Sequence, residues 1–348
     1  MYPLTLTRSL SKRGHTCFLA CRNHSRLAMG AEERGITPYT LPLIMSCDPY
    51  SIYKFSRMLR VHAIEVVHLH YSKDIPFACL SVAASRRPVK IFLTKHTGSG
   101  FKKDIVHKML YKRLDQVIAV SNFIKNDLIK NCPIEEEQIT VIHNGISPSD
   151  YASHLKSPFS IREEFSLRGR VVGMIAQLSV GKGQETFIEA ASLVSQKEKD
   201  VSFLIVGHPA DGEEAFSERL KEKVTQLGMK DRVIFTGYRR DIRNILAAID
   251  LCVSASLDEA FGLGLIESMA MKKPVIAISS GAVPEVVVNG QTGILIDRKD
   301  PKRMAEAIIE LLNDGERLLK MGEKGYCRAM ERFNLDDLIL SLEDLYRK

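Results

Sequence analysis

Residues 254–278 read SASLDEAFGLGLIESMAMKKPVIAI, and this stretch decides the fold. The apolar run at 250–254 predicts a buried strand, and residues 255–260 form a polar loop after it. A helix is expected from about 261 to 271, and a second buried strand at 274–278. A strand, a loop, a helix and a strand in this order form the building block of a parallel sheet.

The entrance to this helix has the features of a phosphate site. Its residues are Phe261, Gly262, Leu263, Gly264 and Leu265. Glycines allow another molecule to approach the backbone closely, and the first turn of a helix offers unpaired amides and a partial positive charge. Glu259 and Glu267 lie eight residues apart, so their carboxylates should face different parts of one elongated ligand. We therefore predict that a nucleotide-sugar lies along this segment.

The stretch resembles the donor-binding signature of retaining glycosyltransferase family four, the group 1 glycosyltransferases. That signature has two glutamates with seven residues between them, a Phe-Gly pair, an apolar helix and a Lys-Pro-Val strand. The matching residues here are Glu259, Phe261-Gly262, Glu267 and Lys273-Pro274-Val275. The later segment GAVPEVV, which begins at Gly281, resembles the family segment that closes the donor site.

The resemblance implies an α/β chain with the GT-B fold, in which two doubly wound Rossmann-like domains face each other across a cleft. Residues 1–150 are the expected acceptor-side domain, and residues 165–330 the expected nucleotide-sugar-binding domain. Residues 145–165 lose hydrophobic periodicity and are the expected linker. The final helix, at 331–348, is expected to cross back to the first domain.

The first half alternates short apolar runs with amphipathic segments, which predicts a doubly wound parallel sheet. Relatives begin with a strand and a glycine-rich loop before a helix that leads into Arg-Gly-His. Arg13-Gly14-His15 is present here, but the strand and loop are not. The chain is therefore expected to be N-terminally truncated, or its first domain to be incomplete.

Three histidines follow strands of the first half, where ligands of open α/β sheets bind. His96 stands in the pattern Thr-x-His, and the resemblance implies that it contacts the donor sugar near the reacting carbon. A histidine that only caps the strand end is the alternative. His68 and His70 are predicted to be structural, and they lack a suitably spaced third ligand for a metal.

The second half offers further donor contacts. Lys182-Gly183 matches the family's Lys-Gly pair, and Lys182 supplies a mobile positive charge before a helix. Gln177 stands where the family has arginine, so a neutral donor replaces a charged fork. The resemblance also places Gly207 in the donor site and seats the nucleotide base at Tyr238. Arg239 or Arg240 is a further candidate phosphate ligand, and a surface arginine without that role is an equal alternative.

The resemblance implies that a sugar moves from a nucleotide-diphosphate donor to a hydroxyl with retention of anomeric configuration. His96, Lys182 and Glu259 are the expected catalytic residues. Gln177, Gly207, Tyr238, Glu267 and residues 261–265 are the expected donor contacts. The nucleotide-sugar is a substrate, so no cofactor is expected, and no metal is expected because the donor loop lacks an Asp-x-Asp pair.

The composition is that of a soluble globular protein, with 45% hydrophobic and 26% charged residues in 348. The seven cysteines are scattered, which favours a reduced cytoplasmic protein. The net charge of +7 permits anionic partners, and no nucleic acid is expected. Basic and apolar residues at 101–114 permit peripheral contact with the inner face of a membrane, where relatives reach lipid-linked acceptors. A solvated basic face is the favoured interpretation of this segment, and membrane contact is the alternative.

Two other functions remain open at this point. A nucleotide-sugar epimerase of the same fold would convert the donor without an acceptor. A non-catalytic donor-binding protein would fit the missing first strand and Gln177. The favoured prediction is a transferase that acts on a glycan or a lipid-linked acceptor, in the synthesis of a cell-surface polysaccharide or lipopolysaccharide.

Overall fold

The computed structural model describes residues 2–44, 47–98, 104–152, 158–297 and 299–348. The chain forms two compact units. The first unit consists of Met1–His143 and Asp336–Lys348, and the second of Asn144–Leu335. The border between them precedes the expected linker at 145–165, and the last helix groups with the first unit.

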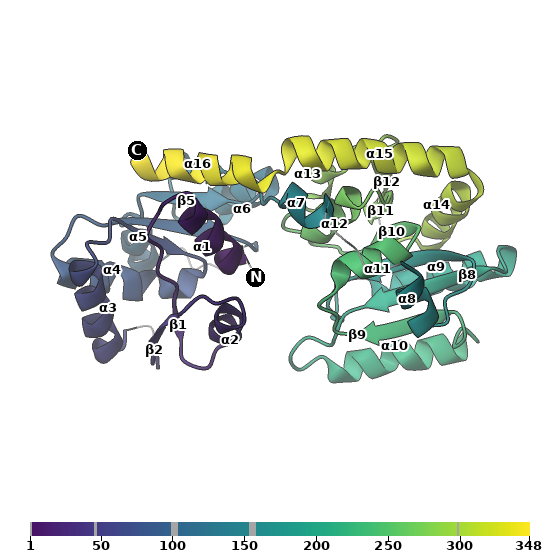
Figure 1. The fold of residues 1–348 in the computed structure, drawn as a ribbon, viewed down its shortest axis with the longest axis horizontal. Coiled ribbons are helices and arrows are strands. Elements are labelled where there is room, and N and C mark those ends of the chain that lie inside the picture. The colour runs from purple at the N-terminus through teal and green to yellow at the C-terminus, as the bar shows by residue number, and fades with distance from the viewer. Residues whose placement is uncertain (1, 45–46, 99–103, 153–157, 298) are drawn as a thin grey trace. The chain divides into compact units, whose positions relative to one another are not determined.

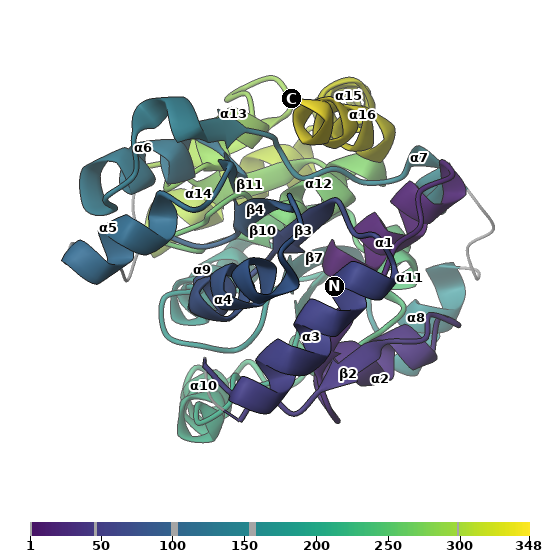
Figure 2. The ribbon, with the colours of Figure 1, turned by 90° about the vertical axis from the view of Figure 1, so that its left-hand side faces the viewer.

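The first unit alternates helices and strands. Its helices are α1 (Tyr2–Lys12), α2 (Arg26–Glu32), α3 (Pro49–Val61), α4 (Ile75–Ser85), α5 (Ile105–Tyr111), α6 (Asn122–Asn131) and α16 (Leu335–Arg347). Its strands are β1 (Ala20–Arg22), β2 (Tyr39–Leu41), β3 (Val66–Leu69), β4 (Lys90–Lys95), β5 (Gln116–Ala119) and β6 (Ile139–Val141). Helices α3 and α4 lie side by side (Figure 2).

The strands of the first unit form two separate parallel sheets. β1 pairs with β2, and β3 to β6 form a second sheet in chain order. This arrangement differs from the single doubly wound sheet expected for this half. Such a sheet winds outward in both directions from a central strand. Within the described residues, no strand pairs with both β1 and β3. The two sheets are therefore not joined by strand hydrogen bonds.

A carboxylate in α16 connects the last helix to the Arg-Gly-His segment near the start of the chain. Glu343 accepts from Arg13 Nε at 2.8 Å and from Arg13 Nη2 at 2.9 Å, and it lies 2.9 Å from His15 Nε2. The hydrogen bonds from Arg13 and His15 lower the pKa of Glu343 to about 2. Glu343 therefore stays ionised at neutral pH and holds α16 within the first unit.

The second unit has one six-stranded sheet. Its strands are β7 (Arg170–Ile175), β8 (Val201–Val206), β9 (Val233–Gly237), β10 (Leu251–Ser254), β11 (Val275–Ile278) and β12 (Gly293–Ile296). Its helices are α7 (Pro148–Ala152), α8 (Pro158–Glu164), α9 (Gln184–Lys197), α10 (Glu214–Gln226), α11 (Ile242–Ala248), α12 (Leu263–Ala270), α13 (Val283–Val286), α14 (Pro301–Asn313) and α15 (Gly315–Arg332). Figure 1 shows their arrangement.

The strand order of this sheet is β12-β11-β10-β7-β8-β9, with all pairs parallel. This is the predicted doubly wound order, because the chain starts in the middle at β7 and winds to one edge and then to the other. The order reverses between β7 and β10. In such sheets the crevice outside the carboxyl ends of these two strands is the usual ligand position.

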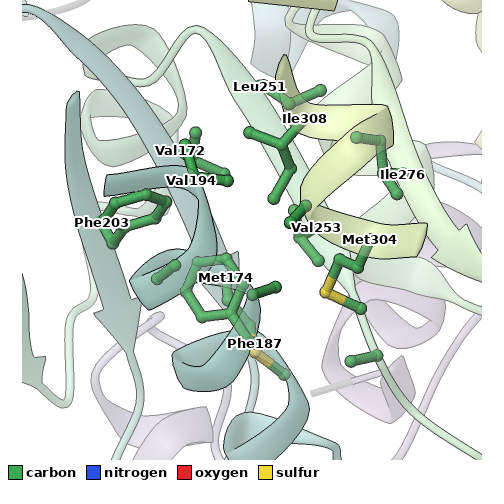
Figure 3. Packing of buried hydrophobic residues seen from close by; sticks show 14 of the residues in the cluster. Val172, Met174, Phe187, Val194, Phe203, Leu251, Val253, Ile276, Met304 and Ile308 are labelled. Atoms are coloured by element: carbon green, nitrogen blue, oxygen red, sulfur yellow. The ribbon is translucent and has the colours of Figure 1, made fainter. Parts of the chain in front are cut away.

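A cluster of buried apolar side chains joins one face of the second sheet to the helices α9 and α14. Phe187 of α9 lies edge-on to Phe203 of β8, with ring centroids 6.0 Å apart. On the same face, α14 packs beside α9, and its Met304 and Ile308 are fully buried in the same cluster (Figure 3). A fully buried side chain of this size contributes about 1.5–3 kcal/mol, so this core fixes the strand ends that carry the site.

Candidate functional site

Two loops of the second unit meet at the point where the strand order reverses. Residues 176–183 follow β7 and lead into α9, and residues 255–262 follow β10 and lead into α12. Because β7 and β10 are paired neighbours, both loops leave the same edge of the sheet. The amide of Leu257 donates to the carbonyl of Gly181 at 3.0 Å, which joins the two loops directly.

Gly183 lies where the two loops are closest. Its φ of +80° is in the left-handed region, and an added Cβ would lie 2.1 Å from the carbonyl oxygen of Ala255. A residue with a side chain would therefore meet both backbone strain and a clash at this position. The glycine keeps the start of α9 against the loop that carries Glu259.

Lys182 reaches from the first loop to the second. Its Nζ lies 3.2 Å from Glu259 Oε2 and 3.4 Å from Ser256 Oγ. The side chains of Lys182 and Glu259 are 35% and 22% exposed, so both remain accessible to a ligand. An ion pair with this exposure is weak, which leaves Lys182 able to exchange its carboxylate partner for a phosphate.

The helix entrance differs in detail from the prediction. α12 begins at Leu263 instead of Phe261, and Gly262 is its N-cap and provides no capping side chain. The first amides of the helix, at Leu263 and Gly264, precede its first helical hydrogen bonds and are available to a ligand. The amide of Leu265 already donates to the carbonyl of Gly262 at 3.0 Å. Phe261 and Leu265 bury their side chains, so neither side chain faces a ligand.

The residues around Gly281 hold the Glu259 loop in place through hydrogen bonds to its backbone. Ser280 Oγ donates to the carbonyl of Ser256 at 2.7 Å, and the amide of Ala282 donates to the carbonyl of Glu259 at 2.8 Å. A Cβ added to Gly281 would lie 2.2 Å from that same carbonyl oxygen. This close backbone approach gives a physical reason for the glycine in the GAVPEVV segment.

Two families of known proteins match the chain. Residues 159–328 match the family described as glycosyl transferases group 1, and residues 1–150 match glycosyltransferase family 4. The chain belongs to the group 1 glycosyltransferases of family four. It is 29% identical to N-acetyl-alpha-D-glucosaminyl L-malate synthase from Bacillus anthracis, over 87% of this chain and 80% of that one. It is 28% identical to a lipopolysaccharide core biosynthesis mannosyltransferase from Rhizobium meliloti, over 69% and 67%.

Solved structures confirm the predicted GT-B fold. A glycosyltransferase from Rickettsia africae superposes with a TM-score of 0.88 at 22% identity, over 99% of this chain and 93% of that one. The Anabaena protein HepE, solved in complex with UDP and glucose, gives a TM-score of 0.84 at 21% identity, over 99% and 95%. The glycosyltransferase chain therefore has the GT-B fold, with two Rossmann-like units.

The second glutamate of this glycosyltransferase's signature already has a partner. The Tyr151 hydroxyl, from α7, donates to the carboxylate of Glu267 on α12. Burial raises the pKa of Glu267, and the hydrogen bond from Tyr151 opposes that shift. Tyr151 has no counterpart in the sequence prediction, because a tyrosine more than a hundred residues away gives no local signal. A ribose that binds Glu267 must join or replace this phenol.

The expected base-binding edge lies after β8 and β9. Gly207 directly follows β8, and the exposed ring of Tyr238 follows β9. Tyr238 lies edge-on to His208, with ring centroids 5.4 Å apart. The two rings make this edge of the glycosyltransferase aromatic, which suits a flat nucleotide base.

Arg239, a candidate phosphate ligand, is paired with two carboxylates. Its guanidinium donates to both oxygens of Asp241 at 2.9 Å and also contacts both oxygens of Glu164. These hydrogen bonds raise the pKa of Arg239 and neutralise its charge locally. A phosphate at Arg239 would have to displace one of these carboxylates, and this contact stays a prediction. Arg240 also has an interaction partner and is not a free cation.

Gln177 lies in the loop after β7, at the position where the family has arginine. Its side chain is exposed, and its carbonyl accepts from Gln184 Nε2 at 2.8 Å. The backbone of Gln177 thus anchors the first turn of α9. The site carries no charge at this position, which leaves Lys182 as the cation beside Glu259.

His96 belongs to the first unit and directly follows β4. Its Nε2 lies 3.2 Å from Nδ1 of His70, which follows the neighbouring strand β3. Burial, and then the charge of Lys95, lower the pKa of His96 to about 4. The imidazole is therefore neutral at pH 7, able to donate or accept a hydrogen bond but not to act as a cation. Its contact with a sugar remains a prediction.

The described residues offer neither a metal cluster nor a membrane-spanning helix. Across these ranges, no three or more His, Cys, Asp or Glu side chains are grouped to hold a metal ion. No helix in the described part of the glycosyltransferase combines the length and the apolar character needed to cross a bilayer. The predicted membrane segment 101–114 is described from residue 104 onward, so Phe101, Lys102 and Lys103 lie outside the described residues.

Proposed function

We propose that the chain transfers a sugar from a nucleotide-diphosphate sugar to an acceptor hydroxyl with retention of configuration. The observation that carries this proposal is the position of Lys182 Nζ, which lies 3.2 Å from Glu259 Oε2. Both residues belong to the loops at the switch point of the second sheet, where the strand order reverses. The first amides of α12 belong to the same loops. A cation and unpaired helix amides together are the usual protein ligands of a diphosphate.

These groups match the charges that develop during the transfer reaction. The bond between the anomeric carbon and the donor phosphate breaks, so positive charge grows on the sugar and negative charge on the leaving diphosphate. Lys182 and the amides of Leu263 and Gly264 stabilise the leaving group, because they are already oriented when that charge develops. Glu259 binds sugar hydroxyls, Glu267 binds the ribose, and Tyr238 and Gly207 border the base. His96 orients the sugar.

Retention is assigned to front-face attack, in which the acceptor hydroxyl enters on the side from which the diphosphate departs. The leaving phosphate takes the proton of that hydroxyl. A double displacement would need a carboxylate nucleophile at the anomeric carbon. Glu259 is committed to Lys182 and to sugar hydroxyls in this proposal. The transfer needs no metal and no cofactor.

Relatives support the donor and acceptor classes. HepE is described in complex with UDP and glucose, and the Rhizobium relative is named for lipopolysaccharide core biosynthesis. We extend these classes to this chain: a nucleotide-sugar donor and a glycan or lipid-linked acceptor of a cell-surface polysaccharide, used at the cytoplasmic face of the membrane. An epimerase would convert donor alone, so incubation without acceptor separates it from a transferase.

A donor screen tests the proposal first. Addition of UDP-glucose, GDP-mannose or ADP-glucose at about 100 times its Kd is expected to raise the Tm of the second unit by about 5 °C or more. Uridine, guanosine and adenosine are the controls, because they lack the diphosphate. A set of donors that leaves Tm unchanged would contradict the proposal. Binding without sugar transfer to any acceptor would favour a non-catalytic donor-binding protein.

Membrane contact is proposed for helix α5. Ile105, Val106 and Met109 are 79%, 64% and 66% exposed, so apolar side chains face solvent on this short helix. Lys108 and Lys112 are exposed beside them. Exposed apolar side chains next to lysines suit the interface of an anionic bilayer, where the first group is buried and the second binds headgroups.

Vesicle sedimentation tests this contact. The chain is expected to bind vesicles that contain phosphatidylglycerol more tightly than vesicles of phosphatidylcholine. The double variant Ile105→Ser, Met109→Ser should bind at least about tenfold more weakly, because two apolar side chains no longer enter the bilayer. Leu319→Ser, which changes an equally exposed residue of α15, is the matched control. Equal vesicle binding by the α5 variant and the control would show that α5 presents a solvated basic face and does not enter the bilayer.

A further inference from the structure

Three histidines of the first unit stack in a row at the ends of β3 and β4. The rings of His68 and His70 have centroids 4.6 Å apart and are tilted by 25°. The rings of His70 and His96 have centroids 5.5 Å apart and are tilted by 23°. The strands are paired in register, with Leu69 opposite Leu93, so the stack is built into the sheet.

The first ring of the row is fixed at both nitrogens. His68 Nδ1 lies 2.5 Å from the Tyr346 hydroxyl, and its Nε2 lies 2.7 Å from Thr94 Oγ1. Tyr2 of α1 also packs edge-on against His70 and His96, with centroids 5.8 Å and 4.9 Å away. His70 is therefore enclosed by the rings of His68, His96 and Tyr2, which fix its orientation.

The contact between His70 and His96 links the protonation of one ring to that of the other. Burial lowers the pKa of both rings, so at pH 7 both are neutral and each has one N–H. One proton lies between His70 Nδ1 and His96 Nε2. If His96 donates it, Nδ1 of His96 is an acceptor; if His96 accepts it, Nδ1 carries the other proton and is a donor. The hydrogen bond at one ring nitrogen sets the state of the other.

We infer that His70 is a positioning residue, which fixes the ring orientation and tautomer of His96 and leaves Nδ1 of His96 as the nitrogen that meets the substrate. This inference rests on the proposed role of His96 in orienting the transferred sugar. It gives a function to a residue that the sequence alone predicts to be structural. His70 touches no substrate in this account and acts only through His96.

Nitrogen NMR of the full chain tests the positioning itself. Histidine is labelled with ¹⁵N, and the ring resonances of His96 are assigned with the variant His96→Asn. The wild type is expected to show one neutral tautomer of His96 at pH 8. His70→Phe keeps a stacked ring but removes the hydrogen bond, so it should show both tautomers. An unchanged tautomer in H70F would overturn the inference, and no substrate is needed for this result.

Turnover then tests whether the positioning matters. Release of nucleoside diphosphate is measured from whichever of UDP-glucose, GDP-mannose and ADP-glucose gives the largest thermal shift. His70→Phe is expected to lower kcat about tenfold with little change in donor KM, because orientation and not binding is lost. His70→Asn places a polar atom near the lost Nδ1 and should recover part of the rate. Equal rates in H70F and the wild type would contradict the inference.

A double-mutant cycle separates this inference from the proposed function. In a His96→Ala background, His70→Phe should have no further effect, because the group that it positions is absent. If H96A alone leaves turnover unchanged, the proposed role of His96 is wrong. If H96A lowers turnover and H70F lowers it by the same factor in both backgrounds, His70 does not act through His96. Tm values of H70F and H70N that equal the wild-type Tm exclude a folding defect as the cause.

Discussion

Lys182→Ala is expected to lower the rate of sugar transfer at least about tenfold, which corresponds to about 1.4 kcal/mol of barrier. Its Nζ lies 3.2 Å from Glu259 Oε2, and Gln177, in the same loop as Lys182, provides no charge. Without it, the leaving diphosphate keeps only backbone amides as ligands. Initial rates of nucleoside diphosphate release with an acceptor measure the effect.

The control for this prediction is Lys197→Ala. Lys197 is exposed in the last turn of α9, the helix that Lys182 precedes, so its removal changes the net charge equally without touching the site. Glu259→Ala should also lose at least about tenfold, since it removes the partner of Lys182 and the proposed sugar contact. Wild-type rates in purified, folded K182A and E259A would refute the site.

Gly183→Ala is expected to destabilise the second unit by about 2–5 kcal/mol and to abolish donor binding. A left-handed backbone costs a residue with a side chain about 1–2 kcal/mol, and a crowded site adds about 1–3 kcal/mol. At Gly183 the new Cβ would lie 2.1 Å from the Ala255 carbonyl oxygen, so the start of α9 must move away from the Glu259 loop. Thermal unfolding and donor titration measure both effects.

Gly181→Ala separates strain from crowding. Gly181 also has a positive φ, of +93°, but nothing lies within 4 Å of an added Cβ. It should lose only the strain of about 1–2 kcal/mol and keep its affinity for the donor. Equal Tm losses in the two variants would show that contact between the loops does not depend on Gly183.

The sequence predicted the second unit well because its signals are local. Apolar runs gave the strands, and the pair Lys182-Gly183 and the segment from Glu259 to Glu267 identified both loops at the switch point. The start of α12 was placed two residues early, because Phe261 is apolar and fits the helical pattern. Its ring is in fact buried edge-on to Phe333, and Gly262 caps the helix.

Contacts between distant residues could not be predicted. Three hydrogen bonds join segments that lie far apart in the sequence. They link Tyr151 to Glu267, Ser280 to Ser256, and Arg239 to Glu164. No periodicity or motif signals such pairs, since they depend on where folded loops end. The same reason explains His70, whose hydrogen bond to His96 requires that β3 and β4 pair in one register. It also explains the first unit's two sheets, whose separation depends on strand pairing and not on strand content.

The central claim is that Lys182 and the first amides of α12 hold the diphosphate of the donor. The most direct test is a crystal structure of the chain with the nucleoside diphosphate of its preferred donor. We expect phosphate oxygens within hydrogen-bond distance of Lys182 Nζ and of the amides of Leu263 and Gly264. A diphosphate that binds elsewhere, with Lys182 still paired to Glu259, would contradict the claim.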